Sequence, residues 1–380
     1  MSSRADFKKF HRTVIKIGSR VICNDQGLAL DRMRALAGQV DLLRRRGMEV
    51  VLVSSGAVAA GRKKLKAFAP ANVKKKQALA AAGQVSLMSA WDKAFANHDV
   101  KVAQILLTAD DLADRRRFMH AKNTVFTLLE MDVIPIINEN DTVALDSLKF
   151  GDNDTLGSLI ASLVEADLFI CLTDLDGLYE SDPRENPDAQ LIGRVEKVNA
   201  ALLAKAGREG RAPFGTGGMF AKVRAAGRLA ERGVPSVIAN GLTRGILPRL
   251  MDGEELGSFF KPSAKPRGAR KHWLAFAARP KGKLIIDAGA AKAILEQGKS
   301  LLPKGVVSLE GLFAAGDPVV VVDARQGNEV GVGLVNYPSP EVQSIMGRPS
   351  HDIQEVLGYS HSDEVIHRDN LVIYESPAEN

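Results

Sequence analysis

The chain has 380 residues, of which 25% are charged and 45% hydrophobic, and its formal net charge is +6. This length accommodates two or three domains, and the composition is that of an ordinary globular protein. No apolar segment of a secretory signal opens the chain, and no uncharged apolar run approaches the ~18 residues of a membrane span. Two cysteines far apart in sequence argue against a disulfide framework or a structural zinc site. We therefore expect a cytoplasmic protein.

The charge is unevenly distributed along the chain. Residues 281–380 hold 8 Lys/Arg and 14 Asp/Glu, a net charge of −6, so the remainder carries +12. A positive excess in the larger part favours an anionic ligand. Basic runs at residues 63–66, 74–76 and 115–117 are also typical of surfaces that simply face water, and this alternative stays open.

Residues 13 to about 240 alternate short apolar runs with helical patterns. The runs are rich in Val, Ile and Leu without polar alternation, which is typical of strands buried on both faces of a parallel sheet. We expect strands at residues 14–17, 50–53, 102–107, 134–137, 168–173 and 236–239. We expect helices at residues 31–46, 77–97, 111–130, 155–165 and 219–232. This alternation predicts a three-layer α/β domain, in which ligands bind at the carboxyl ends of the strands.

A second, smaller domain is predicted after a stretch rich in proline, glycine and basic residues. Short β-type runs lie at residues 284–287, 306–308, 317–322 and 330–335, with one helical pattern at 290–297. Together they predict a small, mostly β module of the barrel type. The expected organisation is a first domain at residues 1–260, a linker at 261–280 and a second domain with its tail at 281–380.

Two motifs near the first strands contain glycine and serine and are suited to bind an anion. Lys16 stands near the end of the first apolar run and is followed by Gly18-Ser19. A lysine there can neutralise phosphate oxygens, although an edge lysine that only reaches for solvent fits the local pattern equally well. The second run leads into residues 54–61, SSGAVAAG, where a helix start offers backbone N–H groups to an anion. These glycines also suit tight strand–helix packing.

Two further clusters, residues 137–141 (INEND) and 151–154 (GDND), are dense in carboxylates and amides. Such groups suit an ammonium group or Mg²⁺, and they also cap helices and form turns. Residues 172–179 (LTDLDGLY) follow another strand, and residues 215–222 (GTGGMFAK) open a helix. A glycine loop at a helix start lets backbone amides approach phosphates closely.

The six motifs in this order resemble those of the glutamate 5-kinase group of the amino acid kinase family, and the resemblance covers nearly the whole chain. The family patterns K-[LI]-G-[ST], SSGA[IV]-A-x-G, INEND, GDND, LTDxxGLY and GTGGM-x-x-K stand at residues 16–19, 54–61, 137–141, 151–154, 172–179 and 215–222. The C-terminal part resembles a PUA domain. Arg20 replaces an expected small polar residue. Phe220-Ala221 replace a residue followed by Thr, which removes a hydroxyl contact expected with the nucleotide.

The resemblance implies that ATP phosphorylates the side-chain carboxylate of L-glutamate to L-glutamyl 5-phosphate, the first step toward proline. It implies catalytic roles for Lys16, Lys222 and Asp154, with Asp154 holding both lysines and bearing on Mg²⁺. It implies that Ser55, Asp141 and Asn153 bind glutamate. The nucleotide-binding residues it implies are Lys16, Thr173, Asp174, Thr216, Gly217, Gly218, Met219, Phe220, Ala221 and Lys222. We expect Mg²⁺ to be carried mainly by the ATP phosphates, with no dedicated protein site.

Other readings remain open. A kinase of the same family could instead phosphorylate aspartate, acetylglutamate, carbamate or UMP. The PUA-like part could bind RNA in a secondary role, although its net negative charge opposes this. A regulator with an inactive kinase fold is opposed by the presence of Lys16, Asp154 and Lys222. The family pattern further implies feedback inhibition by proline, a homodimer or homotetramer, and a glutamyl-phosphate reductase as a possible partner. It implies no membrane association.

Overall fold

The computed structural model describes residues 3–67, 72–144, 153–207, 218–264, 266 and 268–374. The chain divides into two compact units between residues 267 and 268. Each unit has its own sheet and its own hydrophobic core. Within the described residues, no helix is long and apolar enough to cross a membrane.

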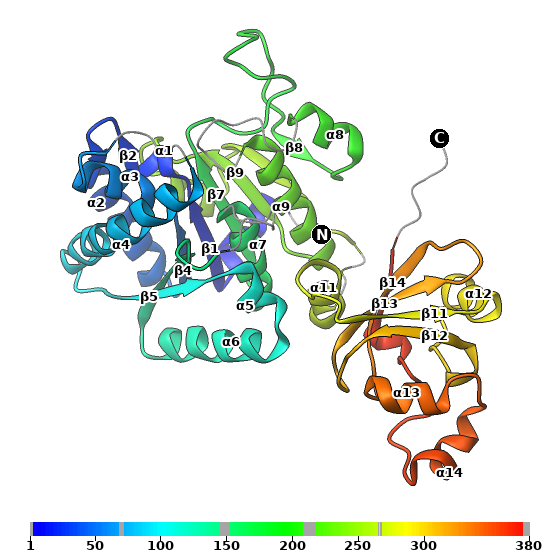
Figure 1. Ribbon diagram of the computed structural model, residues 1–380. Coiled ribbons are helices and arrows are strands. Elements are labelled where there is room, and N and C mark those ends of the chain that lie inside the picture. The colour runs from blue at the N-terminus through cyan, green and yellow to red at the C-terminus, as the bar shows by residue number, and fades with distance from the viewer. Residues whose placement is uncertain are drawn as a thin grey trace. The chain divides into compact units, whose positions relative to one another are not determined.

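The first unit is built on an eight-stranded sheet in the order β5-β6-β4-β1-β7-β9-β10-β8 (Figure 1). Its main strands are β1 (Arg12–Ile17), β4 (Glu49–Ser54), β5 (Lys101–Leu107), β6 (Val133–Glu139), β7 (Leu168–Thr173) and β9 (Ser236–Asn240). These six run parallel, which confirms the predicted mainly parallel sheet. Two short strands that the sequence analysis missed extend one edge. They are β10 (Ser258–Phe260), antiparallel to β9, and β8 (Arg194–Val195).

Helices cover both faces of this sheet and make it the middle of three layers (Figure 1). The helical elements are η1 (Arg4–Lys9), α1 (Ser19–Ile22), α2 (Leu30–Arg45), α3 (Ala57–Lys64), α4 (Val73–Ala96), α5 (Ala109–Ala113), α6 (Arg115–Glu130), α7 (Asn153–Leu163), α8 (Ala200–Lys205), α9 (Met219–Arg232) and α10 (Ile246–Met251), and a hairpin joins β2 (Cys23–Asn24) to β3 (Gly27–Leu28). Side chains of α2, α4 and α10 share one core with β1, while α7 packs on the other side, against Lys16 and α9.

One predicted helix, at residues 111–130, is two helices in the structure. The break falls at Asp114, whose backbone leaves the helical region and whose carboxylate accepts hydrogen bonds from the N–H groups of Arg116 and Arg117. An aspartate in this position caps a new helix start, because it satisfies donors that have no partner within the helix. The apolar pattern of the sequence continues across Asp114, so the pattern predicts a single helix.

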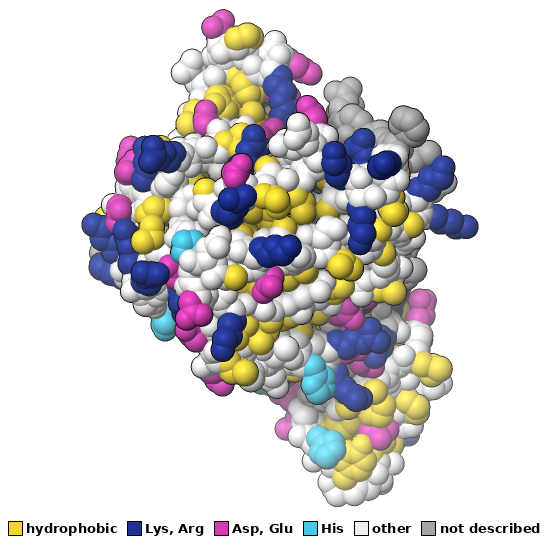
Figure 2. All heavy atoms as spheres, turned by 90° about the vertical axis from the view of Figure 1, so that its left-hand side faces the viewer, with side chains coloured by type: hydrophobic (Ala, Val, Ile, Leu, Met, Phe, Trp, Pro, Cys, Tyr) yellow, Lys and Arg dark blue, Asp and Glu magenta, His cyan; other side chains and the backbone are white. Residues whose placement is uncertain are grey.

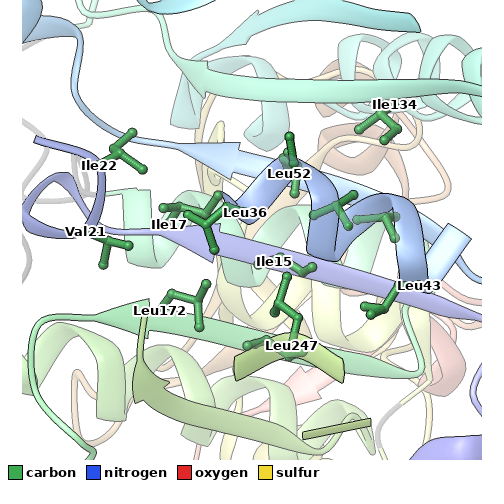
Figure 3. Close-up of a cluster of buried hydrophobic side chains, with 14 of the residues drawn as sticks. Ile15, Ile17, Val21, Ile22, Leu36, Leu43, Leu52, Ile134, Leu172 and Leu247 are labelled. Carbon is green, nitrogen blue, oxygen red and sulfur yellow. The ribbon is translucent and has the colours of Figure 1, made fainter. Parts of the chain in front are cut away.

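The core of the first unit explains how the strand ends are held in register. Ile15 and Ile17 of β1 point to the same face as Leu52 of β4 and Leu172 of β7, and Leu36 and Leu247 of the covering helices pack on them (Figure 3). Residues of one strand alternate between faces, so Val14 and Lys16 point the other way. The same alternation therefore buries the isoleucines and directs the Lys16 side chain toward α7.

The second unit contains a five-stranded sheet in the order β12-β11-β13-β14-β15. Its elements are α11 (Ala269–Phe276), β11 (Gly282–Ile286), α12 (Ala288–Gln297), η2 (Pro303–Gly305), β12 (Val306–Gly311), β13 (Pro318–Asp323), β14 (Glu329–Leu334), α13 (Ser339–Ile345), η3 (Ser350–Asp352), α14 (Ile353–Leu357), η4 (Arg368–Asn370) and β15 (Leu371–Ile373). The predicted small β-rich module is confirmed. Strand β15 escaped the sequence analysis because it is only three residues long.

The face shown in Figure 2 carries charged side chains of both signs. Lys and Arg side chains are interspersed there with Asp and Glu. The basic residues 115–117 are exposed, as are Lys63, Lys64 and Lys66. Exposed basic runs of this kind are typical of surfaces that face water. The polar motifs at the carboxyl ends of the strands are therefore the better candidates for a ligand site.

Candidate active site at the carboxyl ends of the central strands

The polar motifs meet at one edge of the parallel sheet. Ile17 at the end of β1 pairs with Ser54 of β4 and with Leu172 of β7. Just beyond these pairs, the Gly18 N–H donates to the carbonyl of Leu172, and the Ser55 N–H donates to the carbonyl of Ile17. The ends of β1, β4 and β7 are thereby joined by backbone hydrogen bonds. The residues that follow them are held side by side.

A buried ion cluster lies at this edge. Lys16 Nζ is 2.5 Å from Asp154 Oδ1, and Lys222 Nζ is 2.9 Å from Asp154 Oδ2. Lys16 comes from β1, Asp154 from the first turn of α7 and Lys222 from the first turn of α9. The three side chains are at most 7% exposed. Two buried ammonium groups are thus held by the two oxygens of one carboxylate, and ammonium groups attract anions.

The electrostatic balance of the cluster keeps Asp154 ionised. Burial alone would raise the pKa of this carboxyl, but the charges of Lys16 and Lys222 outweigh burial and lower the pKa to about 2. Cys171 of β7 is buried, and its thiol donates to Asp154 Oδ1 over 3.4 Å. Burial and the neighbouring carboxylate raise the pKa of Cys171 to about 12, so the thiol keeps its proton.

A network of carboxamides lies beside the ion cluster. Asn153 Nδ2 donates to Ser55 Oγ over 2.9 Å and to Asn138 Oδ1 over 3.0 Å, with a longer contact of 3.3 Å to the carbonyl of Ser54. Asn138 in turn donates from Nδ2 to Gln84 Oε1 over 2.8 Å. Ser55 and Asn153 are thus in direct contact, as their expected common role requires. Asn138 and Gln84 were not among the predicted site residues.

Asp141 lies in the turn after β6, close to the network in sequence. In the part of the chain that the structure describes, its ion-pair partner is Lys76, with 4.0 Å between Nζ and Oδ1. Burial raises the pKa of Asp141 above its ordinary value, and the opposing effect of Lys76 is smaller. A partly buried carboxylate whose described ion-pair partner is 4.0 Å away is suited to bind an ammonium group.

Thr173 is the last residue of β7, on the other side of β1 from β4, and Asp174 follows it. Asp174 Oδ2 accepts from Arg20 Nη1 over 2.9 Å and from Arg184 Nη2 over 3.2 Å. Arg20 stands where a small polar residue was expected, and it forms an ion pair with a predicted nucleotide-binding residue. Burial would raise the pKa of Asp174, but the Arg20 guanidinium and other donors lower it overall. Thr173 is buried and donates from its hydroxyl to Asp174 Oδ1 over 3.2 Å.

The glycine loop is described only in part. Thr216 and Gly217 lie outside the described residues, as do Gly151 and Asp152 of the fourth motif. Gly218 directly precedes α9, which opens with Met219, Phe220 and Ala221. Ala221 is buried, so a hydroxyl at this position would face the interior of the unit. The ring of Phe220 packs against the Arg224 guanidinium, which lies 5.4 Å from the ring centre.

Glycine packing places α3 and α4 beside the site. Gly56 precedes α3 with φ +109°, a conformation that side chains rarely adopt, and a Cβ there would meet Cys23. A Cβ at Gly61 would lie 1.8 Å from the carbonyl oxygen of Leu79, and one at Gly83 would lie 1.9 Å from that of Ala57. Only glycines allow the two helices to approach this closely. The start of α3 is thereby fixed beside Ser55.

Two family models match the chain. The amino acid kinase family model matches residues 11–240, and the PUA domain model matches residues 282–357. The first match covers all of the motifs described above. The second lies within the smaller unit and includes its first four strands.

Sequence relatives match over nearly the whole length. A glutamate 5-kinase of Syntrophotalea carbinolica is 50% identical over 363 residues, which cover 95% of this chain and 97% of the relative. One from Geobacter sulfurreducens is 49% identical, with 96% of this chain and 98% of the relative covered. The structure of a carbamate kinase from Giardia lamblia, bound to AMP-PNP, shares the fold at 17% identity, with a TM-score of 0.50 over 67% of this chain and 100% of that protein. The chain belongs to the amino acid kinase family, within its glutamate 5-kinase group, and carries a PUA domain.

Proposed function

We propose that this chain transfers the γ-phosphoryl group of ATP to the side-chain carboxylate of L-glutamate, giving L-glutamyl 5-phosphate and ADP as the first step of proline biosynthesis. The observation that carries the proposal is the buried cluster in which Lys16 and Lys222 bind opposite oxygens of Asp154. Its two ammonium groups, at the edge where the substrate motifs meet, suit a reaction between two anions.

The chemical step needs alignment and charge neutralisation. The attacking oxygen belongs to a carboxylate whose reference pKa is near ~4.3, so it is already ionised at neutral pH and no general base is required. This oxygen forms a bond to the γ-phosphorus, and the bond from that phosphorus to the bridging oxygen of ADP breaks. Lys16 and Lys222 stabilise the charge on the phosphoryl oxygens, and Asp154 holds both ammonium groups in place.

The two substrates occupy opposite sides of β1 in this proposal. Ser55, Asn153 and Asp141 bind glutamate on the β4 and β6 side, with Asp141 meeting the ammonium group. Thr173 and Asp174 bind the nucleotide on the β7 side, together with the glycine loop at residues 216–222. The order of the strands, β6-β4-β1-β7, supports this division because Lys16 of β1 then lies between the two groups.

Mg²⁺ would neutralise the ATP phosphates when bound to them. Within the described residues, no group of three or more His, Cys, Asp or Glu side chains is arranged to hold a metal ion. Both oxygens of Asp154 already bind ammonium groups. Because both oxygens of Asp154 are engaged in this way, we assign Mg²⁺ to the ATP phosphates.

Further parts of the proposal follow from the family. Proline would inhibit at or overlapping the glutamate site, the kinase units would associate into a dimer or tetramer, and a reductase would consume the labile acyl phosphate. We place the protein in the cytoplasm. Each of these statements has a direct test, by inhibition kinetics, sedimentation, co-purification and cell fractionation in turn.

The reaction is tested by ADP release from Mg-ATP with each candidate acceptor, in the presence of hydroxylamine to trap an acyl phosphate. We expect hydroxamate with L-glutamate, suppressed by proline. Hydroxamate with aspartate or acetylglutamate instead would move the substrate while keeping the roles of the lysines. No ADP release with any acceptor would refute the proposed reaction.

A further inference from the structure

Gln84 lies at one end of the carboxamide network of the site. It lies on α4 next to Gly83, whose contact with the Ala57 carbonyl fixes the helix against α3. Its Oε1 accepts a hydrogen bond from Asn138 Nδ2, yet its Nε2 is buried and has no hydrogen-bond partner among the described residues. At the other end of the network, Asn153 Oδ1 is also buried, and no described residue pairs with it.

The direction of the network explains why these two atoms remain unpaired. Asn138 Oδ1 accepts from Asn153 Nδ2 and from the Glu139 N–H, so Asn138 Nδ2 must donate, and Gln84 Oε1 is its acceptor. A reversed Gln84 carboxamide would set its amino group against that of Asn138. The chain of amides therefore leaves a donor at one end and an acceptor at the other. Buried amide groups without partners are unfavourable. A ligand that forms hydrogen bonds with them offsets this free-energy cost, which favours its binding.

The free donor of Gln84 matches the α-carboxylate of an amino acid, because a carboxylate accepts hydrogen bonds from an amide donor. Asn138 lies on β6, two strands from Lys16 on β1, which corresponds to about 10 Å across the sheet. An amino acid that presents its side-chain carboxylate near Lys16 can therefore extend its α-carbon groups toward the Gln84 end of the network.

We propose that Gln84 is a specificity-determining residue that donates from Nε2 to the α-carboxylate of the substrate, while Asn138 fixes the direction of its carboxamide. This inference rests on the proposed glutamate kinase activity. Gln84 binds the α-carboxylate, and Asp141 binds the ammonium group. Together they select an α-amino acid over a simple dicarboxylic acid.

Two variants separate this role from a purely structural one. Gln84→Ala removes both the donor and the acceptor for Asn138. Gln84→Glu keeps an acceptor for Asn138 but sets a negative charge against the α-carboxylate. We expect the KM for L-glutamate to rise about 10- to 100-fold in Gln84→Ala, as for loss of a hydrogen bond to a charged group, and further in Gln84→Glu. The KM for ATP and kcat should change less than about 3-fold in both.

The control is Gln39 on α2, whose Oε1 accepts from the Leu247 N–H on the far side of the core. Gln39→Ala and Gln39→Glu should leave the KM for glutamate unchanged. A wild-type KM in Gln84→Glu beside an impaired Gln84→Ala would overturn the proposal and reduce Gln84 to a support for Asn138. Unchanged KM values in both variants would also overturn it, while the activity itself stood. If Gln84→Ala does not fold, Gln84→Glu decides alone. A wild-type protein inactive on L-glutamate would refute the activity and this role together.

Discussion

Arg20 forms an ion pair with Asp174, with 2.9 Å between Nη1 and Oδ2, at the edge of the sheet where a nucleotide is proposed to bind. Arg184 reaches the same carboxylate oxygen over 3.2 Å. The two guanidinium groups and the one carboxylate carry a net charge of +1. Arg20 and Arg184 are more than half exposed, so this charge is available to an approaching polyphosphate but is screened by salt.

Arg20→Ser should weaken ATP binding without unfolding the protein. An exposed ion pair contributes about 0.2–1 kcal/mol to stability, so the change in unfolding free energy should stay within about 1 kcal/mol. The KM for ATP should rise about 2- to 5-fold at low ionic strength, and the difference should shrink as salt is added. Steady-state kinetics at two salt concentrations would measure this, with Arg34→Ser on α2 as the control. An unchanged KM at low salt would mean that Arg20 has no part in nucleotide binding.

Asp154 should give the protein a specific sensitivity to acid. Its pKa falls from 3.8 to about 2 on folding, because the two lysine charges outweigh burial. A lowered carboxyl pKa contributes stability that is complete above the unfolded value and is lost as the pH falls from about 4 to about 2. The difference of nearly two pKa units corresponds to roughly 2–3 kcal/mol.

Asp154→Asn should abolish this acid-sensitive part and also destabilise the protein at neutral pH. Two buried ammonium groups then lose the carboxylate that both of them bind, and breaking a buried ion pair typically costs about 3–5 kcal/mol. Urea unfolding of both proteins between pH 2 and pH 7 would measure the difference. The curves should converge as the pH falls. Parallel curves over this range would show that Asp154 does not titrate as expected.

Lys16 and Lys222 should each contribute to kcat far more than to binding. Lys16→Met and Lys222→Met remove one preorganised charge next to the phosphoryl group, and kcat should fall on the order of 10²–10³-fold. Each variant also leaves Asp154 with a single ammonium partner, so the pKa of that carboxyl should rise. The kinetics need a stability control, which circular dichroism can supply. A kcat within 3-fold of wild type in a folded variant would remove that lysine from the mechanism.

The meeting of the polar motifs at one edge of the sheet could be predicted from sequence, whereas the roles of Lys16, Asp154 and Lys222 were expected only from the family resemblance. Buried parallel strands fix which edge holds Lys16 and Thr173, and helix starts at that edge supply Asp154 and Lys222. The partners of Arg20, Cys171 and Gln84 could not be predicted. Their contacts depend on how far neighbouring elements approach and rotate. In particular, Gln84 meets Asn138 only because α4 is held close to α3, and a glutamine in a helical pattern carries no sign of this.

Asp141 should make glutamate binding depend on pH. Burial raises the pKa of this carboxyl, so it takes up a proton at a higher pH than an ordinary aspartate. Only the ionised form pairs with an ammonium group, and the KM for glutamate should therefore rise as the pH falls toward this raised pKa. Asp141→Asn should raise the KM about 10- to 100-fold and remove that part of the pH dependence. An Asp141→Asn enzyme with the wild-type KM would contradict the assignment.

Gly83 should couple the stability of the protein to its affinity for substrate. Alanine is the better helix former by up to ~1 kcal/mol, so Gly83→Ala in the middle of α4 would be stabilising if space allowed. A Cβ there would instead lie 1.9 Å from the Ala57 carbonyl oxygen, and the two helices must separate. We expect a loss of about 1–3 kcal/mol in unfolding free energy, as for an overpacked core. The shift of α4 should also draw Gln84 away from Asn138 and raise the KM for glutamate. Gly193→Ala, where a Cβ meets nothing within 4 Å, is the matched control and should change neither quantity. A stabilised Gly83→Ala would show that the helix pair relaxes freely, and an unchanged KM in a destabilised variant would separate this packing from the substrate site.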